Sequence, residues 1–276
     1  MRIIRLADAP ALIPAWDRFV AEHKYGTWWH TSAWLAYQRA YRSGNIDESF
    51  AVLDGAGSVV AVAPLIVSKG AENAPEFSFS WMPTPRVLHY PRDGRFDPPG
   101  LHAVFADQRE RVAKQYGVRR GVFGGWATDD DAPADSPITQ RVVLLTHPEP
   151  ALWSAVRKSY KALIHRGERE LVILASNNYE QALRYEALHR RIYSDPRPTA
   201  TYLLQTRWVQ DGRAAVIDAQ DSRSETIGVA LWYVYKGSAY YASGAYSADN
   251  VAHAVVWRSL LALKARGVIS AVMAWR

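Results

Sequence analysis

The chain has 276 residues, of which 49% are hydrophobic and 22% are charged, so it is long enough for one large domain or two smaller ones, each with its own core. Its 33 basic and 27 acidic residues give a net charge of +6, which suits a polyanionic partner but does not require one. The absence of cysteine excludes disulfides, thiolate nucleophiles, zinc ribbons and iron–sulfur clusters.

The first half of the sequence predicts an α/β arrangement. In chain order we expect a strand at 2–6, helices at 9–24 and 32–41, a β-hairpin of 50–53 and 58–67, a long loop at 81–100, a helix at 103–116, and strands at 119–123 and 140–145. The hairpin is the clearest of these elements, because Asp54-Gly55-Ala56-Gly57 supplies glycines for a tight turn. Ser32 is the expected N-cap of the second helix.

The second half repeats the order of helices followed by a hairpin. Here we expect helices at 151–170, 179–191, 203–211 and 251–265, with strands at 214–219, 226–235, 238–243 and 268–275. The segment His147-Pro148-Glu149-Pro150 opens the first of these helices and predicts a boundary between domains 1–148 and 149–276. The repetition indicates two copies of one α/β unit.

Several common functional classes lack their sequence signals. The chain has no G-x-S-x-G elbow, no H-E-x-x-H, no P-loop lysine motif and no Rossmann glycine pattern. The acidic run at 129–135 lacks the spacing of a calcium loop, and no two of the eight histidines are three or four residues apart. We therefore expect no metal site, no membrane span and no signal peptide, and a cytoplasmic location.

The predicted helix at 151–170 carries a strongly basic face. Arg157, Lys158, Lys161 and His165 fall on one side of it, opposite an apolar stripe. Two interpretations remain open from the residues alone. The face is either an ordinary solvated surface or a contact for the phosphates of a nucleotide or an RNA backbone.

Aromatic residues are unusually common, with 11 tryptophans and 15 tyrosines, which favours either a thick aromatic core or a groove that stacks on flat ligands. Three of the tryptophans, Trp28, Trp29 and Trp34, cluster around a turn after Trp16. This arrangement, followed by the hairpin that ends in Pro64-Leu65, resembles the N-terminal half of the FemABX-like proteins.

Further segments extend the resemblance over most of the chain. They are Tyr90-Pro91-Arg92-Asp93-Gly94, the helix from Leu152 to Arg169, Ile227-Gly228-Val229-Ala230, the run Tyr240 to Ala245, and Trp257 to Gly267. The FemABX-like proteins are built from tandem GNAT-type acyltransferase units. The resemblance thus implies an α/β (α+β) fold in which each unit has a mixed, mostly antiparallel sheet flanked by helices.

The resemblance also implies an activity. FemABX-type proteins move an amino acid from aminoacyl-tRNA to a peptide amine without a metal or an organic cofactor, whereas more distant GNAT relatives use acetyl-CoA. The glycine-rich pyrophosphate loop of ordinary GNAT proteins is missing, since Arg120 to Gly125 has its glycines at other offsets. The leading hypothesis is therefore an aminoacyl-tRNA-dependent transferase acting on a small peptide or other amine. The alternatives are an acyl-CoA-dependent N-acyltransferase on an amino sugar or amino acid, and a non-catalytic RNA- or glycan-binding protein.

Candidate site residues follow from this chemistry. Aminolysis of an activated ester needs an unprotonated amine and hydrogen-bond donors for the developing oxyanion. The expected catalytic residues are Tyr202, Ser243 and Asp195, with Asp218 as another proton acceptor; the expected substrate-binding residues are Trp34, Gln38, Arg39, Arg92, Arg197 and Tyr246; and the expected tRNA phosphate contacts are Arg157, Lys158, Lys161 and Arg166. Gln38 stands where the family commonly has a lysine for nucleotide phosphates, which disfavours a UDP-linked acceptor. A structural role remains the alternative for each tyrosine and serine.

Overall fold

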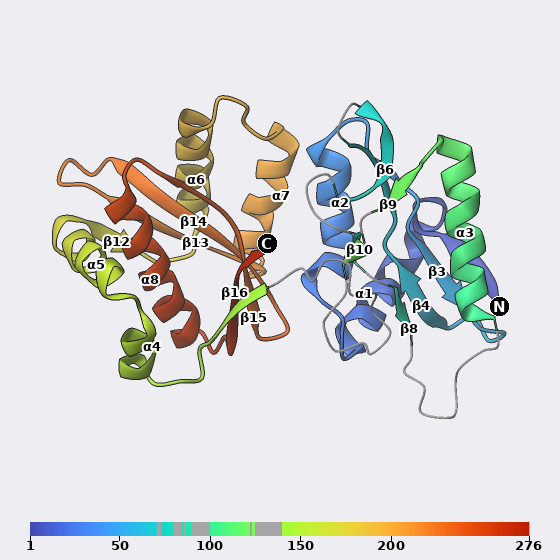
Figure 1. Ribbon diagram of the computed structural model, residues 1–276, viewed down its shortest axis with the longest axis horizontal. Coiled ribbons are helices and arrows are strands. Elements are labelled where there is room, and N and C mark those ends of the chain that lie inside the picture. Colours follow the sequence, from blue (N-terminus) through green and yellow to red (C-terminus); the bar gives the residue numbers. More distant parts are fainter. Residues whose placement is uncertain are drawn as a thin grey trace. The chain divides into compact units, whose positions relative to one another are not determined.

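The computed structural model describes residues 1–70, 73–79, 84–85, 87–89, 100–121, 123–124 and 140–275 (Figure 1). The chain divides into two compact units, Met1–Ile138 and Thr139–Arg276. The expected α/β fold, with mostly antiparallel sheets flanked by helices, is confirmed.

In the described part of unit 1, short strands form small sheets beside helices. The helices are α1 (Ile13–Glu22), α2 (Ser32–Tyr41) and α3 (Leu101–Tyr116), and the strands are β1 (Arg2–Arg5), β2 (Ile46–Asp47), β3 (Phe50–Leu53), β4 (Val59–Ala63), β5 (Ile66–Lys69), β6 (Pro75–Phe77), β7 (Thr84–Pro85), β8 (Leu88–His89), β9 (Arg120–Gly121) and β10 (Phe123–Gly124). One sheet has the order β1-β3-β4-β8, another has the order β2-β5-β6-β9, and β10 pairs with β7.

The predicted hairpin of unit 1 is confirmed as β3 and β4. Asp54 closes its turn, because the Asp54 carboxylate accepts hydrogen bonds from the backbone N–H groups of Ala56 and Ser58, both at 2.9 Å. The expected strand 58–67 is interrupted at Pro64-Leu65, and its second part becomes β5 in the other sheet.

The aromatic turn before α2 belongs to the core of unit 1. Trp28, Trp29 and Trp34 are all buried. The N-cap of α2 is Thr31 rather than Ser32, since Thr31 Oγ1 accepts a hydrogen bond from the Trp34 N–H, while Ser32 bonds to the Asp17 carboxylate. Of the two interpretations offered by composition, the core explains these tryptophans.

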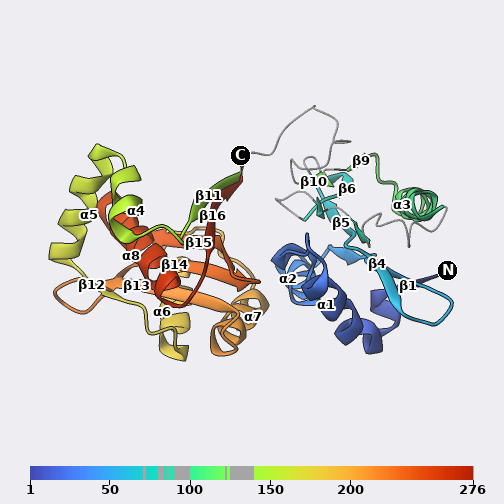
Figure 2. The ribbon, with the colours of Figure 1, turned by 90° about the horizontal axis from the view of Figure 1, so that it is seen from below.

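Unit 2 is a six-stranded sheet with helices on both faces. Its elements are β11 (Gln140–Leu144), α4 (Glu149–Ala155), α5 (Lys158–Glu170), β12 (Val172–Leu174), α6 (Tyr179–Ile192), α7 (Thr199–Gln210), β13 (Ala214–Gln220), β14 (Thr226–Tyr235), β15 (Ser238–Tyr246), α8 (Asp249–Ala265) and β16 (Ser270–Trp275). The strand order is β11-β16-β15-β14-β13-β12, antiparallel except for the parallel pair β15 and β16. Helices α5 and α8 lie on one face of this sheet, and α6 and α7 lie on the other (Figure 2).

Two expectations for unit 2 need correction. The boundary between the units lies before β11 and not at 149, because β11 pairs with the C-terminal strand β16 and Leu145 is buried in the core of unit 2. The proline pair starts a helix instead of separating domains. The expected helix 151–170 is two helices, since Val156 and Arg157 have extended backbone conformations between α4 and α5.

Candidate functional site

The sheet of unit 2 opens between its two parallel strands. Strands β15 and β16 pair only from Ser238 to Tyr240, opposite Ser270 to Val272, although β15 continues to Tyr246. Beyond that point β16 stays paired with β11 on its other side. Residues 241–246 of β15 thus keep β14 as a neighbour on one edge but lose β16 on the other, which leaves backbone N–H and C=O groups on that edge for other partners.

A β-bulge marks the same place. The register of β14 and β15 shifts so that Leu231 faces Ser243 while Trp232 faces Tyr241, which makes Ala242 the extra residue. A bulge bends its strand and increases the local twist. The bulge therefore bends β15 away from β16 at Tyr241 to Ser243.

Side chains from α6 and from the segment that follows it converge on this opened part of β15. The Tyr193 hydroxyl donates a hydrogen bond to the Gly244 carbonyl at 2.8 Å, and the Tyr185 hydroxyl is hydrogen-bonded to Ser243. Arg197 donates from Nη1 to the Tyr185 hydroxyl at 3.1 Å. We call this group, together with His189, Tyr202, Tyr241 and Tyr246, the tyrosine cluster.

Local sequence positions the helical part of the cluster. Asn178 and Gln181 form a capping box that starts α6. Tyr185, His189 and Tyr193 follow at intervals of four residues, so they lie along one face of the helix. Pro198 then precedes α7, where the Thr201 hydroxyl donates to the Pro198 carbonyl at 2.7 Å.

His189 is held neutral inside the cluster. Its Nδ1 is hydrogen-bonded to the Tyr202 hydroxyl at 2.9 Å, and its ring lies 4.4 Å from that of Tyr193. Burial, followed by the positive charges of Arg197 and Arg190, lowers the pKa of His189 to about 4. At neutral pH the imidazole is therefore uncharged and is a poor proton acceptor.

Four of the five tyrosines of the cluster also stay protonated. Burial raises the pKa of Tyr185, Tyr202 and Tyr241, and raises that of Tyr246 well above its ordinary value. Tyr241 and Tyr246 bond to each other through their hydroxyls at 2.9 Å. The cluster thus consists of neutral hydroxyl groups and an imidazole beside the guanidinium of Arg197, which is chemistry suited to donating hydrogen bonds.

Gly244 makes room for this pair of hydroxyls. A Cβ atom built on Gly244 would meet the Tyr241 hydroxyl at 2.2 Å and the Tyr246 hydroxyl at 2.5 Å. Any larger residue would push the two tyrosines away from the strand.

The structure brings together four of the expected site residues: Tyr202, Ser243, Arg197 and Tyr246. Tyr202 and Ser243 are only 1% and 8% exposed, which suits them to holding other groups in place. Asp195 is exposed in the segment between α6 and α7. Sequence reasoning missed Tyr185, His189 and Tyr193, although their four-residue spacing was a usable signal.

Asp218 is not placed to accept a proton at this site. It is fully buried, and its carboxylate accepts hydrogen bonds from Arg184 Nε at 2.8 Å and from Gln181. These contacts tie β13 to α6. Its role is structural.

The candidate substrate residues of unit 1 are mostly engaged within that unit. Trp34 is 1% exposed and stacks on Tyr37 with the ring centroids 4.8 Å apart, and Gln38 is 0% exposed. Arg39 forms an ion pair with the buried carboxylate of Asp47 at 2.8 Å. We therefore assign Trp34 and Gln38 to the core rather than to a binding surface. Arg92 and the acidic run at 129–135 lie outside the described residues.

The expected phosphate contacts gather at the start of α5. Arg157 precedes the helix, Lys158 begins it, and no acidic residue lies in its first turn. The Arg157 guanidinium lies over the Tyr160 ring at 5.9 Å, and Lys161 Nζ lies over the Trp153 ring at 5.5 Å.

Arg166 differs from the other three cations. It lies two turns further along α5 and forms an ion pair with Glu170 at 3.0 Å. The positive charge of the α5 N-terminus, where the helix dipole adds to it, is therefore carried by Arg157, Lys158 and Lys161.

Among the described residues, no group of three histidine or acidic side chains is arranged to hold a metal ion. Within the same residues, no helix is long and apolar enough to cross a membrane.

Comparisons with known proteins place this geometry in context. No protein-family model matches the sequence, and no curated protein matches it either. Among solved structures, FemX is similar over 100% of this chain and 89% of its own, with a TM-score of 0.63 and 11% identity. The C-terminal domain of a putative lysylphosphatidylglycerol synthetase from Agrobacterium fabrum is similar over 96% and 78%, with a TM-score of 0.53 and 11% identity.

A third similar structure is Saccharomyces cerevisiae N-myristoyltransferase with bound myristoyl-CoA, which matches 99% of this chain and 76% of its own, with a TM-score of 0.51 and 10% identity. At such identities the likeness concerns the fold. The resemblance expected from the sequence is confirmed at that level, and this chain has the fold of FemX.

Proposed function

We propose that this protein transfers an acyl group to an amine, and specifically an amino acid from aminoacyl-tRNA to the amine of a small peptide or peptide-like acceptor. The observation that carries the proposal is the opening between β15 and β16, with the tyrosine cluster beside it. The edge of β15 that β16 leaves and the hydroxyls of the cluster lie at one place in the fold.

Aminolysis of the aminoacyl ester needs few catalytic groups beyond these. The amine nitrogen attacks the ester carbonyl, the bond to the ribose oxygen breaks, and the proton lost by the amine ends on that oxygen. Positioning of the two reactants supplies much of the acceleration, with effective molarities of about 10⁵ M in favourable cases. We propose that backbone N–H groups on the edge of residues 241–246 that β16 leaves, with Arg197, stabilise the negative charge on the carbonyl oxygen; the end of the β15–β16 pairing and the position of Arg197 beside Tyr185 support this role.

The cluster favours hydrogen-bond donation over base catalysis. A protonated His189 is opposed by burial and by two arginines, and burial favours the protonated forms of Tyr185 and Tyr202. We infer that the amine arrives unprotonated from solution. Asp195, in the exposed segment after α6, is the one proposed proton acceptor at the edge of this site.

Two features favour tRNA as the donor. The cations Arg157, Lys158 and Lys161 lie at the start of α5, whose first turn has no acidic residue, and this positive helix end suits the phosphates of a large polyanion. FemX has the same fold at the highest TM-score among the three structures compared.

A second candidate function is acyl-CoA-dependent N-acylation of an amino sugar or amino acid. It is favoured by the similarity in fold to an N-myristoyltransferase whose structure contains myristoyl-CoA. A non-catalytic RNA- or glycan-binding protein is the remaining alternative.

One assay separates these functions. The protein is incubated with a pool of amines and either radiolabelled aminoacyl-tRNAs or labelled acetyl-CoA, and the product is tested for an amide that survives mild alkali. Transfer from tRNA supports the main proposal, and transfer from CoA alone supports the second. Binding of RNA or glycan with no transfer from either donor would leave the non-catalytic alternative.

Charge variants test the donor contact in the same assay. Replacing Arg157, Lys158 and Lys161 with glutamine should weaken transfer from tRNA and make it less dependent on salt. Each lost phosphate contact reduces the slope of log binding constant against log salt concentration by about 0.7 to 0.9 in magnitude. The matched control is Arg207→Gln, an exposed arginine on α7 on the other face of the sheet. Equal effects from both variants would contradict a specific contact at α5.

A further inference from the structure

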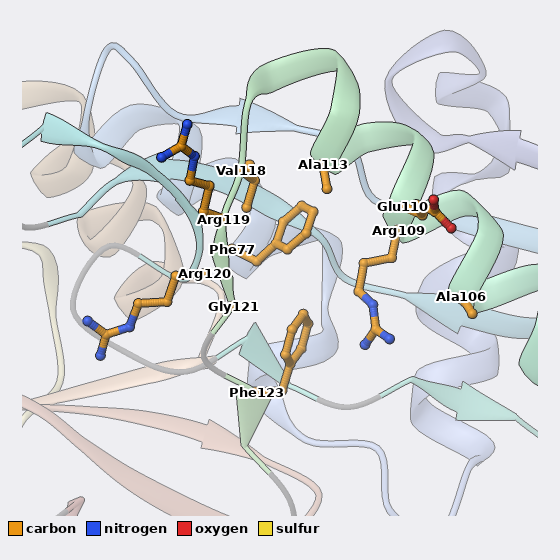
Figure 3. Close-up of a pocket in the computed structure, with 10 residues that line it drawn as sticks. All are labelled: Phe77, Ala106, Arg109, Glu110, Ala113, Val118, Arg119, Arg120, Gly121 and Phe123. Atoms are coloured by element: carbon orange, nitrogen blue, oxygen red, sulfur yellow. The ribbon is translucent and has the colours of Figure 1, made fainter.

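Unit 1 contains an open groove that has no part in the proposed transfer site. It has a volume of about 370 Å³ and lies between α3 and the segment that carries β9 and β10 (Figure 3). Phe77, Ala106, Ala113 and Val118 form its apolar surface. The rest of the lining consists of Phe123, three arginines, Glu110 and Gly121.

Phe123 is the exposed platform of the groove. Its side chain is 38% exposed, and its ring packs on the buried ring of Phe77 with the centroids 6.1 Å apart. Gly121 permits this position, because a Cβ on Gly121 would lie 2.5 Å from the Phe123 ring. The groove therefore presents a supported aromatic surface, which is the feature that stacks on nucleic-acid bases.

Arginines stand on both sides of that platform. Arg109 reaches down from α3 toward the rings, whereas Arg119 and Arg120 lie on the opposite side with their side chains directed away from the rings (Figure 3). The Arg109 guanidinium lies 5.3 Å from the centroid of the Phe123 ring. These cations are separated by the aromatic platform instead of converging on one point.

The positive charge of the groove is not neutralised within the described part of the chain. Across those residues, no carboxylate lies within ion-pair distance of Arg109, Arg119 or Arg120. Glu110, the acidic residue of the lining, is paired with Lys114 at 2.6 Å. The positive charge of the groove thus complements a ligand that carries more than one phosphate.

We propose that this groove binds a short stretch of single-stranded polynucleotide, with a base stacked on Phe123 and the flanking phosphates paired with Arg109 on one side and Arg119 and Arg120 on the other. An open groove with cations on two rims fits a strand that crosses it. Small ligands are instead enclosed over 70–90% or more of their surface as a rule. The proposal concerns binding by unit 1 and stands or falls independently of acyl transfer.

Fluorescence anisotropy of the full-length protein with a labelled 12-nucleotide single-stranded RNA tests the proposal. Phe123→Ala should weaken binding by about tenfold, the effect of losing one stacked base. Phe123→Leu keeps apolar packing but removes the ring, and should weaken binding similarly with an unchanged melting temperature. The double variant Arg109→Gln, Arg120→Gln should reduce the slope of the logarithm of the binding constant against the logarithm of the salt concentration by about 1.4 in magnitude.

The matched control is Arg111→Gln, on the same helix but outside the groove, where Arg111 bonds to Gln108. It should leave affinity within about twofold of wild type. Unchanged affinity in the Phe123→Leu protein would overturn the stacking platform, as would an equal loss in the Arg111 control. Competition by AMP as effective as that of the oligonucleotide would also overturn the proposal, because it would indicate a small-ligand site.

Discussion

His189 lies among three tyrosine rings, and its protonation is linked to the stability of unit 2. Its pKa is about 4 in the folded protein, against an ordinary value of 6.5. Between these values the unfolded chain binds a proton that the folded chain does not, so this residue makes the protein less stable as the pH falls from 6.5 to 4. Above pH 6.5 the contribution is constant.

His189→Asn should remove that pH dependence while keeping a polar atom near the position of Nδ1. We expect the free energy of unfolding of the wild type to fall more steeply from pH 6.5 to 4 than that of the variant, measured by urea denaturation. His165→Asn, a change at an exposed histidine of α5, is the control and should follow the wild-type curve. Parallel curves for wild type and His189→Asn would show that His189 is protonated normally in the folded state.

At this scale, the sequence indicated polar residues that the fold brings together, but it did not show which aromatic and polar residues are buried, and the catalytic and binding roles stay predictions. Tyr202, Ser243, Arg197 and Tyr246, which were selected for their polar side chains or for the family resemblance, meet in one cluster. Trp34 and Gln38 carry the same kind of signal but are enclosed by the core of unit 1. Burial depends on tertiary packing, which a single sequence does not display.

Among the elements of unit 2, α5 and α8 pack unusually closely at one glycine. A Cβ on Gly167 would lie 2.5 Å from the Cβ of Ala254 and 3.1 Å from the Asn250 carbonyl oxygen. Valine has a better intrinsic helix propensity than glycine, so any loss of stability in Gly167→Val must come from this contact.

We expect Gly167→Val to lower the free energy of unfolding by about 1–3 kcal/mol, the usual effect of overpacking. Ala162→Val, at an exposed position of the same helix, is the control and should lower it by less than about 1 kcal/mol. Chemical denaturation measures both. A smaller loss in Gly167→Val than in Ala162→Val would contradict the close packing of α5 on α8.

Elements with strong periodicity were the most predictable. Residues 32–41 and 226–235 form the expected helix and strand without change. The break between α4 and α5 was missed because an apolar stripe continues through Val156. Strand β12 was missed because it is only three residues long and owes its existence to pairing with β13.

For the whole molecule, the boundary between the units rests on β11. This strand follows unit 1 in the sequence but completes the sheet of unit 2, where Leu145 is 1% exposed and Lys264 donates a hydrogen bond to its carbonyl at 2.6 Å. Proline content placed the boundary at 149, since the sequence does not reveal that the first strand of unit 2 pairs with the last.

A comparison of two fragments tests this boundary. We expect residues 139–276 to unfold cooperatively, and residues 149–276 to be at least about 2 kcal/mol less stable, because they lose the buried side chain of Leu145 and the partner of β16. Thermal and urea denaturation supply the comparison. Equal stability of the two fragments would place β11 outside the folding unit.

The central claim is that acyl transfer takes place where β15 leaves β16 beside the tyrosine cluster. The most direct measurement is the rate of amide formation from labelled aminoacyl-tRNA by wild type, by Gly244→Ala and by Gly55→Ala. Alanine at 244 displaces the hydroxyls of Tyr241 and Tyr246, whereas nothing lies within 4 Å of a Cβ at 55. We predict transfer by wild type and Gly55→Ala, and at least about a tenfold loss in folded Gly244→Ala. Equal rates in all three proteins, or no transfer by the wild type, would contradict the claim.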